Sequence, residues 1–160
     1  MRMRKVLPAI LALLATLATS AAAQTLLDGV LLKFGDDIVT RSDVRQARLL
    51  KLVRPDGEAD EAYVAALVDR KLMLAELKRS PPAEPSPEAI DARRGQWLAK
   101  IGSGTNVPDL LARAGMTDAL LRGWLRDDLR LQAYLDDRFA GRTTDIAAWI
   151  TTLRQRAGIK

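Results

Sequence analysis

The stretch EAYVAALVDRKLMLAELKR, residues 61–79, decides the fold, because its apolar residues recur at helical spacing and form one wide face. A helix with so wide an apolar face has to bury it against several neighbouring elements. We therefore expect residues 61–79 to be the central core helix. The apolar face comprises Val64, Leu67, Val68, Leu72 and Ala75, flanked by Leu74 and Leu77.

Further helices are predicted on both sides of this one, each bounded by a capping residue, a proline or a glycine. Ser42 is the predicted N-cap of the first, and Ser86 with Pro87 begins the one that follows a proline-rich connector. Glycines end most of them, since glycine takes up the left-handed backbone conformation at little cost. The predicted ranges are 43–53, 87–101, 108–114, 117–139 and 144–157.

A β-hairpin is predicted at the N-terminal side, from Val30–Phe34 and Ile38–Thr40 around a turn that begins with Gly35 and Asp36. A lone hairpin is barely stable in water, so it has to pack on helices or gain a third strand. The fold class that follows is mainly α: an orthogonal multi-helix domain of about five helices with a small N-terminal β-hairpin.

The first 23 residues have the three-part pattern of a secretory signal peptide. Arg2, Arg4 and Lys5 form a cationic start, the segment 6–19 is apolar and uncharged, and Ala21-Ala22-Ala23 offers a cleavage site. We expect cleavage after Ala23, a periplasmic location and one domain over residues 24–160. A retained membrane anchor is the alternative that this pattern leaves open.

Composition excludes several classes of function. Cys and His are both absent, which removes the commonest zinc ligands and the usual general base of Ser and Cys nucleophiles. The leader carries three of the 25 basic residues and none of the 20 acidic ones, which leaves 22 basic against 20 acidic residues and a net charge of +2. We therefore expect no enzyme activity, no cofactor, no metal and no nucleic-acid partner.

The remaining candidates are apolar side chains and acidic pairs. Trp residues on the apolar stripes of helices are usually core residues, but some of them can instead line an apolar groove. The acidic pairs Asp127-Asp128 and Asp136-Asp137 sit among arginines, so solvated helix faces explain them. The predicted peptide-binding cleft consists of Trp97, Met116, Trp124 and Leu125.

The order of these parts resembles the N-terminal domain of the SurA-type periplasmic chaperones. The hairpin followed by Ile38-Val39-Thr40-Arg41-Ser42-Asp43-Val44 is similar to the opening of that family. The likeness continues through the core helix around 68–74, the Pro85-Ser86-Pro87-Glu88 start of the next helix and the break at 115–117. It covers nearly the whole chain after the leader.

The resemblance implies a chaperone module alone, because no parvulin prolyl isomerase domain stands between the long helix and the last one. It also implies that the last helix folds back on the domain and that a short strand at Ile159 joins the hairpin. We expect an ATP-independent holdase for unfolded or nascent envelope polypeptides, peripheral to the membrane at most. An adaptor for one folded partner is the alternative, and a homodimer that exchanges terminal elements stays open.

Overall fold

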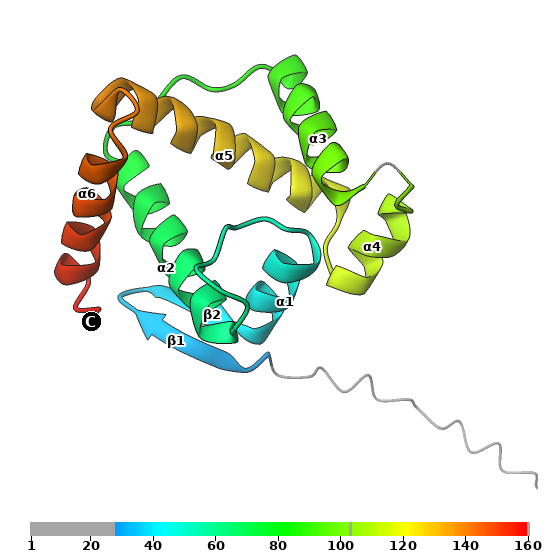
Figure 1. The fold of residues 1–160 in the computed structure, drawn as a ribbon, viewed down its shortest axis with the longest axis horizontal. Coiled ribbons are helices and arrows are strands. Elements are labelled where there is room, and N and C mark those ends of the chain that lie inside the picture. Colours follow the sequence, from blue (N-terminus) through cyan, green and yellow to red (C-terminus); the bar gives the residue numbers. More distant parts are fainter. Residues whose placement is uncertain (1–27, 103, 160) are drawn as a thin grey trace, which may run out of the picture.

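The computed structural model describes residues 28–102 and 104–159, which form two strands and six helices (Figure 1). This confirms the mainly helical class with a small hairpin. The predicted leader, residues 1–23, lies outside the described residues. The elements are β1 Val30–Phe34, β2 Asp37–Thr40, α1 Arg41–Leu49, α2 Asp60–Leu77, α3 Pro87–Ile101, α4 Val107–Ala114, α5 Asp118–Phe139 and α6 Thr143–Arg156.

The hairpin forms as its turn residues predict. β1 and β2 are antiparallel, and Phe34 pairs with Asp37, so Gly35 and Asp36 make a two-residue turn. Gly35 has a φ of +52°, a value that a side chain would strain.

The start of α1 differs from the prediction by two residues. Thr40, not Ser42, is the N-cap: the Asp43 amide donates to Thr40 Oγ1 at 3.2 Å, and the Thr40 amide donates to an Asp43 carboxylate oxygen at 3.0 Å. This reciprocal pair is a capping box, and it satisfies two amides that the helix leaves without partners. The prediction missed it because Ser42 and Thr40 are both good N-cap residues.

The central position of α2 is confirmed. It packs against β2, α1, α5 and α6, and the ribbon in Figure 1 runs through the middle of the molecule. Leu67, Val68 and Leu77 of the predicted apolar face are buried, and Val64 and Leu72 are partly buried.

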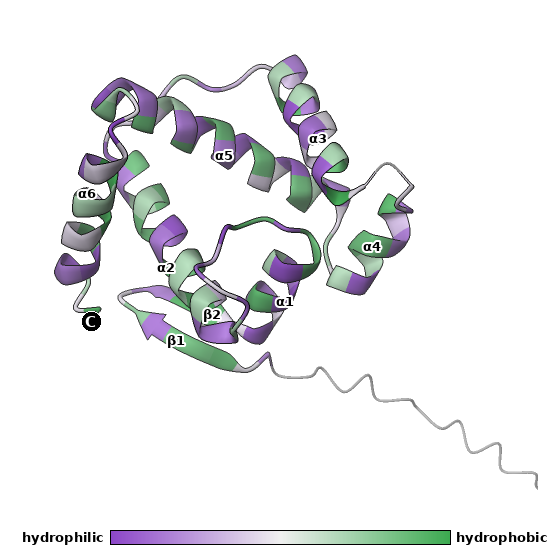
Figure 2. Ribbon diagram, viewed as in Figure 1, coloured by the Kyte–Doolittle hydropathy of each residue, from purple (hydrophilic) through white to green (hydrophobic). Residues whose placement is uncertain are grey.

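The core consists of two hydrophobic clusters. One joins β1, β2, α1 and α2 and contains Phe34, Val39 and Tyr63, among others. The other joins α3, α4 and α5 to the loop after α1, whose Leu50 is fully buried. Hydrophobic residues continue along this loop and along β1 (green in Figure 2). The loop after α1 therefore links the two halves of the domain.

The predicted strand at Ile159 is absent from the sheet, which has two strands in the described part of the chain. After α6 the backbone turns at Gly158, where φ is +70°, and Ile159 packs against the hairpin cluster instead. A contact through one apolar side chain thus replaces the backbone pairing that we expected. The folding back of the last helix does occur, since α6 packs on α2.

Replacing Thr40 by Ala should lower the free energy of unfolding by about 1–2 kcal/mol, because the amide of Asp43 loses its partner at the start of α1. Urea denaturation followed by circular dichroism measures the change. Ser42→Ala is the matched control and should change stability by less than about 0.5 kcal/mol. A larger loss for Ser42→Ala than for Thr40→Ala would contradict the assignment of the cap.

Candidate functional site

Three of the four predicted cleft residues belong to the core. Trp97, Met116 and Leu125 are only 5%, 8% and 2% exposed, all within the cluster of α3, α4 and α5. The Trp97 indole nitrogen donates to the carbonyl of Leu50 at 2.8 Å. An open cleft built from these side chains is therefore not present. The sequence pattern could not distinguish core residues from residues that line a groove, since both recur at the same helical spacing.

The fourth, Trp124 of α5, is half-buried and lies beneath a cation. The Arg70 guanidinium carbon sits 4.0 Å from the centre of the indole, and Arg70 also donates to the Trp124 carbonyl at 3.1 Å. The Trp124 indole nitrogen is buried and has no hydrogen-bond partner among the described residues. Trp124 thus makes a cation–π contact with Arg70 and takes part in the packing between α2 and α5.

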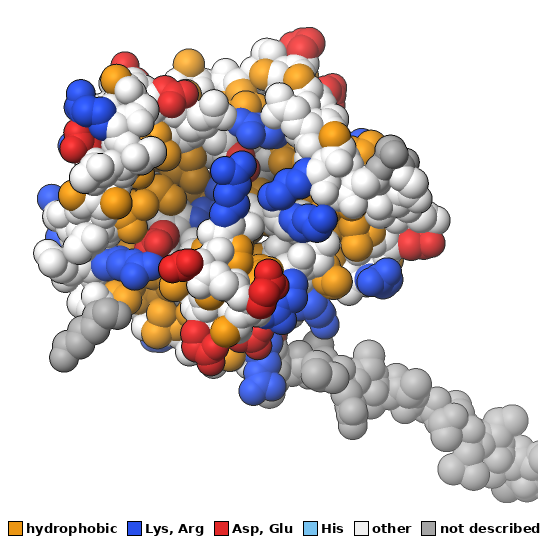
Figure 3. All heavy atoms as spheres, viewed as in Figure 1, with side chains coloured by type: hydrophobic (Ala, Val, Ile, Leu, Met, Phe, Trp, Pro, Cys, Tyr) orange, Lys and Arg blue, Asp and Glu red, His pale blue; other side chains and the backbone are white. Residues whose placement is uncertain are grey.

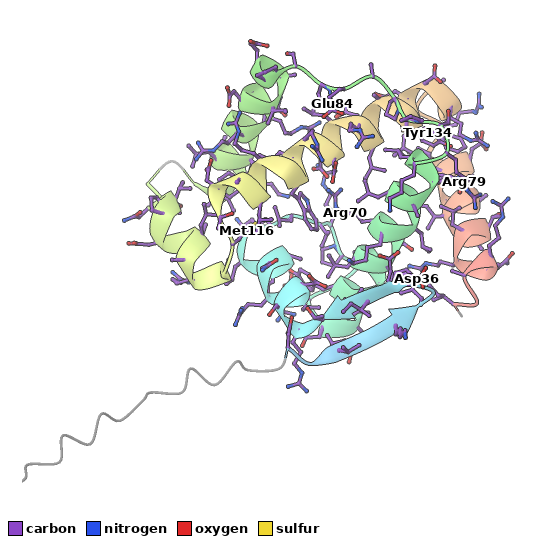
Figure 4. All side chains as sticks on the ribbon, turned by 180° about the vertical axis from the view of Figure 1, so that it is seen from behind. Asp36, Arg70, Arg79, Glu84, Met116 and Tyr134 are labelled. Carbon is purple, nitrogen blue, oxygen red and sulfur yellow. The ribbon has the colours of Figure 1, made fainter. Side chains whose placement is uncertain are left out.

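Arg70 makes an ion pair that ties α2 to α5. Its guanidinium donates to a carboxylate oxygen of Asp128 at 2.6 Å, and the two side chains are 8% and 32% exposed. Burial lowers the pKa of Arg70 and raises the pKa of Asp128, although each charge opposes the shift of the other. The side chain of Arg70 lies between the two helices (Figure 4). The prediction of solvated acidic faces was therefore wrong for Asp128.

An apolar groove lies above this ion pair, between α2, α5 and α6. It is a cavity of about 470 Å³, open to solvent. Figure 3 shows hydrophobic atoms in the hollow between these three helices. We call it the α2–α5–α6 groove and define it by eight apolar residues: Leu52, Val53, Ala66, Met73, Leu131, Leu135, Ile146 and Ile150.

Helical spacing explains why these side chains converge. On α2 the lining residues Ala66, Asp69, Arg70 and Met73 are three or four positions apart and share one face. On α6, Ile146 and Ile150 are four positions apart. On α5 the lining residues recur at the same interval: Asp128, Leu131, Gln132, Leu135 and Asp136.

α6 is held as a wall of this groove by two contacts. The Arg154 guanidinium donates two hydrogen bonds of 2.5 and 2.8 Å to the Asp69 carboxylate. Trp149 packs against Tyr134 and Phe139, with ring centres 5.7 and 5.4 Å apart. Leu153 is the one residue of α6 that is buried. Ile146 and Ile150 are consequently left half-exposed toward the groove.

Other kinds of site find little support in the described part of the chain. Residues 28–102 and 104–159 contain no group of three His, Cys, Asp or Glu residues placed to hold a metal ion. None of the described helices is long and apolar enough to cross a membrane. The α2–α5–α6 groove is a candidate site of another kind, an apolar surface open to solvent.

Comparison with protein-family models, with curated proteins and with solved structures finds no match for this chain. The resemblance to SurA-type chaperones therefore stays a prediction.

The sequence reasoning missed most of the groove. Ile146 and Ile150 were on the predicted stripe of the last helix, but Leu131 and Met73 were on no stripe that we identified. A signal for them existed: α5 carries a second apolar row, Leu131 and Leu135, beside the row that enters the core. A helix with two apolar rows has two apolar neighbours to cover.

Replacing Asp128 by Asn should lower the free energy of unfolding by about 2–3 kcal/mol, because the buried Arg70 loses the charge that compensates it. Asp127→Asn is the matched control, since that neighbour pairs only with the partly exposed Arg126 and Arg130 and should cost less than about 1 kcal/mol. Urea denaturation compares the two variants. The double variant Arg70→Met, Asp128→Leu should regain part of the loss, and equal stability of the two single variants would contradict a structural role for the pair.

Proposed function

We propose that this protein is an ATP-independent periplasmic chaperone that holds unfolded or outer-membrane client polypeptides in an apolar cleft. The observation that carries the proposal is the α2–α5–α6 groove, a solvent-open cavity of about 470 Å³ with eight apolar residues in its lining. Apolar surface of this kind on a soluble domain commonly marks a binding site.

The chemistry of the lining favours broad over specific recognition. Most of the polar groups at the floor already have partners: Arg70 pairs with Asp128, and Asp69 pairs with Arg154. A ligand therefore gains mainly from covering the half-exposed Leu135, Ile146 and Ile150, and the flexible Met73 adapts to different side chains. Such a groove is expected to bind many different apolar sequences and not one specific sequence.

The expected affinity is low. Burying one apolar side chain is worth about 1.5–3 kcal/mol, and a cavity of this size takes only a few of them. The loss of freedom on association offsets part of that gain. Dissociation constants of about 1–1000 μM follow, which suit a chaperone that has to release its clients without ATP.

The periplasmic part of the proposal rests on the leader pattern in residues 1–23 and on the resemblance to SurA-type chaperones. The absence of His and Cys fits a role in binding without covalent chemistry.

One observation favours the alternative, an adaptor or assembly subunit that binds one folded envelope partner. The hairpin exposes Val30, Leu31 and Ile38, which form a small apolar surface away from the groove. A folded partner covers such a surface more readily than an unfolded chain does, and it forms a complex of one defined stoichiometry.

The purified protein at several-fold molar excess should slow the aggregation of an unfolded outer-membrane protein, measured by light scattering. Ile150→Asn should reduce this protection severalfold, because a polar group then lies in the groove. Thr151→Asn is the matched control, since Thr151 is exposed on the same helix and should keep full protection.

Circular dichroism must show that both variants keep the helical content of the parent. Two results would contradict the proposal: an absence of protection by the parent protein, or equal protection by the parent and a folded Ile150→Asn variant.

A further inference from the structure

A second cavity, of about 400 Å³, opens beside the groove between the end of α1, α3 and α5. Its lining contains four cations, Lys51, Arg54, Arg93 and Lys100, against a single carboxylate, Asp128. Figure 3 shows Lys and Arg side chains gathered around the hollow in the middle of the molecule. We call this cavity the basic pocket.

The positive charge of the basic pocket is only partly compensated from within. Asp128, its one acid, is already paired with Arg70. In residues 28–102 and 104–159, none of the four cations of the pocket forms a salt bridge with a carboxylate. The Nε of Arg93 is buried and has no hydrogen-bond partner in the same part of the chain. An excess of positive charge is therefore available to an anion, although one guanidinium nitrogen of Arg93 already donates to Gln132.

The two lysines are held in place by the backbone. Lys51 Nζ donates to the Lys100 carbonyl at 3.2 Å, and Lys100 Nζ donates to the Lys51 carbonyl at 2.7 Å. Each ammonium group has three protons, so each keeps donors for a ligand. Burial and the charges of Arg54 and Lys51 lower the pKa of Lys100, and a bound anion would relieve this repulsion. These crossed bonds also join the turn after α1 to the end of α3.

The basic pocket is continuous with the α2–α5–α6 groove. Leu52, Arg54, Arg93 and Asp128 line both cavities. A ligand that fills both must therefore have apolar groups on one side and a negative charge next to them. A polypeptide that lies in the groove can place a negatively charged group beside Arg54 and Arg93.

We propose that the basic pocket binds the C-terminal carboxylate of a client polypeptide whose preceding apolar side chains lie in the groove. This inference rests on the proposed function and names the class of client segment that the site selects. Arg54 and Arg93, on the border of the two cavities, are the donors nearest to the groove, and the lysines supply charge behind them.

The test uses N-terminally labelled heptapeptides of alternating Leu and Ser, with a free or an amidated C-terminus, and fluorescence anisotropy with the purified protein. The free acid should bind about tenfold more tightly than the amide, as one charge-assisted contact allows. The difference should shrink severalfold in 0.5 M salt, because partly exposed charges are screened.

Two variants locate the effect. Arg54→Gln should abolish most of the difference between the acid and the amide without unfolding the protein, because Arg54 is exposed at the border of the two cavities. Lys100→Met, which removes a second cation of the pocket, should also reduce the difference between the acid and the amide. Arg113→Gln, an exposed cation of α4 outside both cavities, is the matched control and should keep the full difference.

The outcomes separate this inference from the proposed function. Suppose that the acid and the amide bind the parent protein equally and that Ile150→Asn weakens the binding of both. This result would support the groove as a binding site and overturn the carboxylate site. An amidated peptide with an internal Glu that binds as tightly as the free acid would overturn the assignment to a chain end. Binding of neither peptide would overturn the groove and, with it, this inference.

Discussion

The ion pair of Arg70 and Asp128 is the contact on which both cavities depend. It joins the centre of α2 to the centre of α5, and both residues line the groove while Asp128 also lines the basic pocket. Trp124 supports the guanidinium from below. The distance between α2 and α5 is set by this contact, because a 6% exposed arginine cannot lose its carboxylate and remain buried.

A buried ion pair rarely stabilises a fold more than an apolar pair of the same volume would, because both charges lose their hydration. Its consequence here is geometric and electrostatic. The polar groups of Arg70 and Asp128 at the floor of the groove are already paired with each other. Apolar side chains are therefore the part of the groove that favours ligand binding. Asp128 forms its salt bridge with Arg70, so the four cations of the basic pocket outnumber a single carboxylate that is already paired.

The sequence predicted the elements well and the site poorly, for physical reasons. Gly35 and Ser86 act locally, so the turn and the start of α3 could be predicted from residue types alone. The cap of α1 had two candidates, and only the geometry selects Thr40. The site depends on contacts between residues far apart in the chain: Arg70 meets Asp128 58 positions away, and Lys51 meets Lys100 49 positions away. Periodicity holds no information on such pairs, and it misplaced Trp97, Met116 and Leu125.

The width of the groove depends on the least buried helix. α6 has Leu153 as its one buried residue, and it is held by the Asp69–Arg154 fork and the packing of Trp149, whereas α2 is surrounded on several sides. Elements with few buried contacts open at the lowest free energy. Movement of α6 away from α5 would widen the groove and would also shift Ile159, which follows α6 and packs against the hairpin cluster. A rigid floor with one weakly held wall is the arrangement that lets a small domain accept apolar segments of different size.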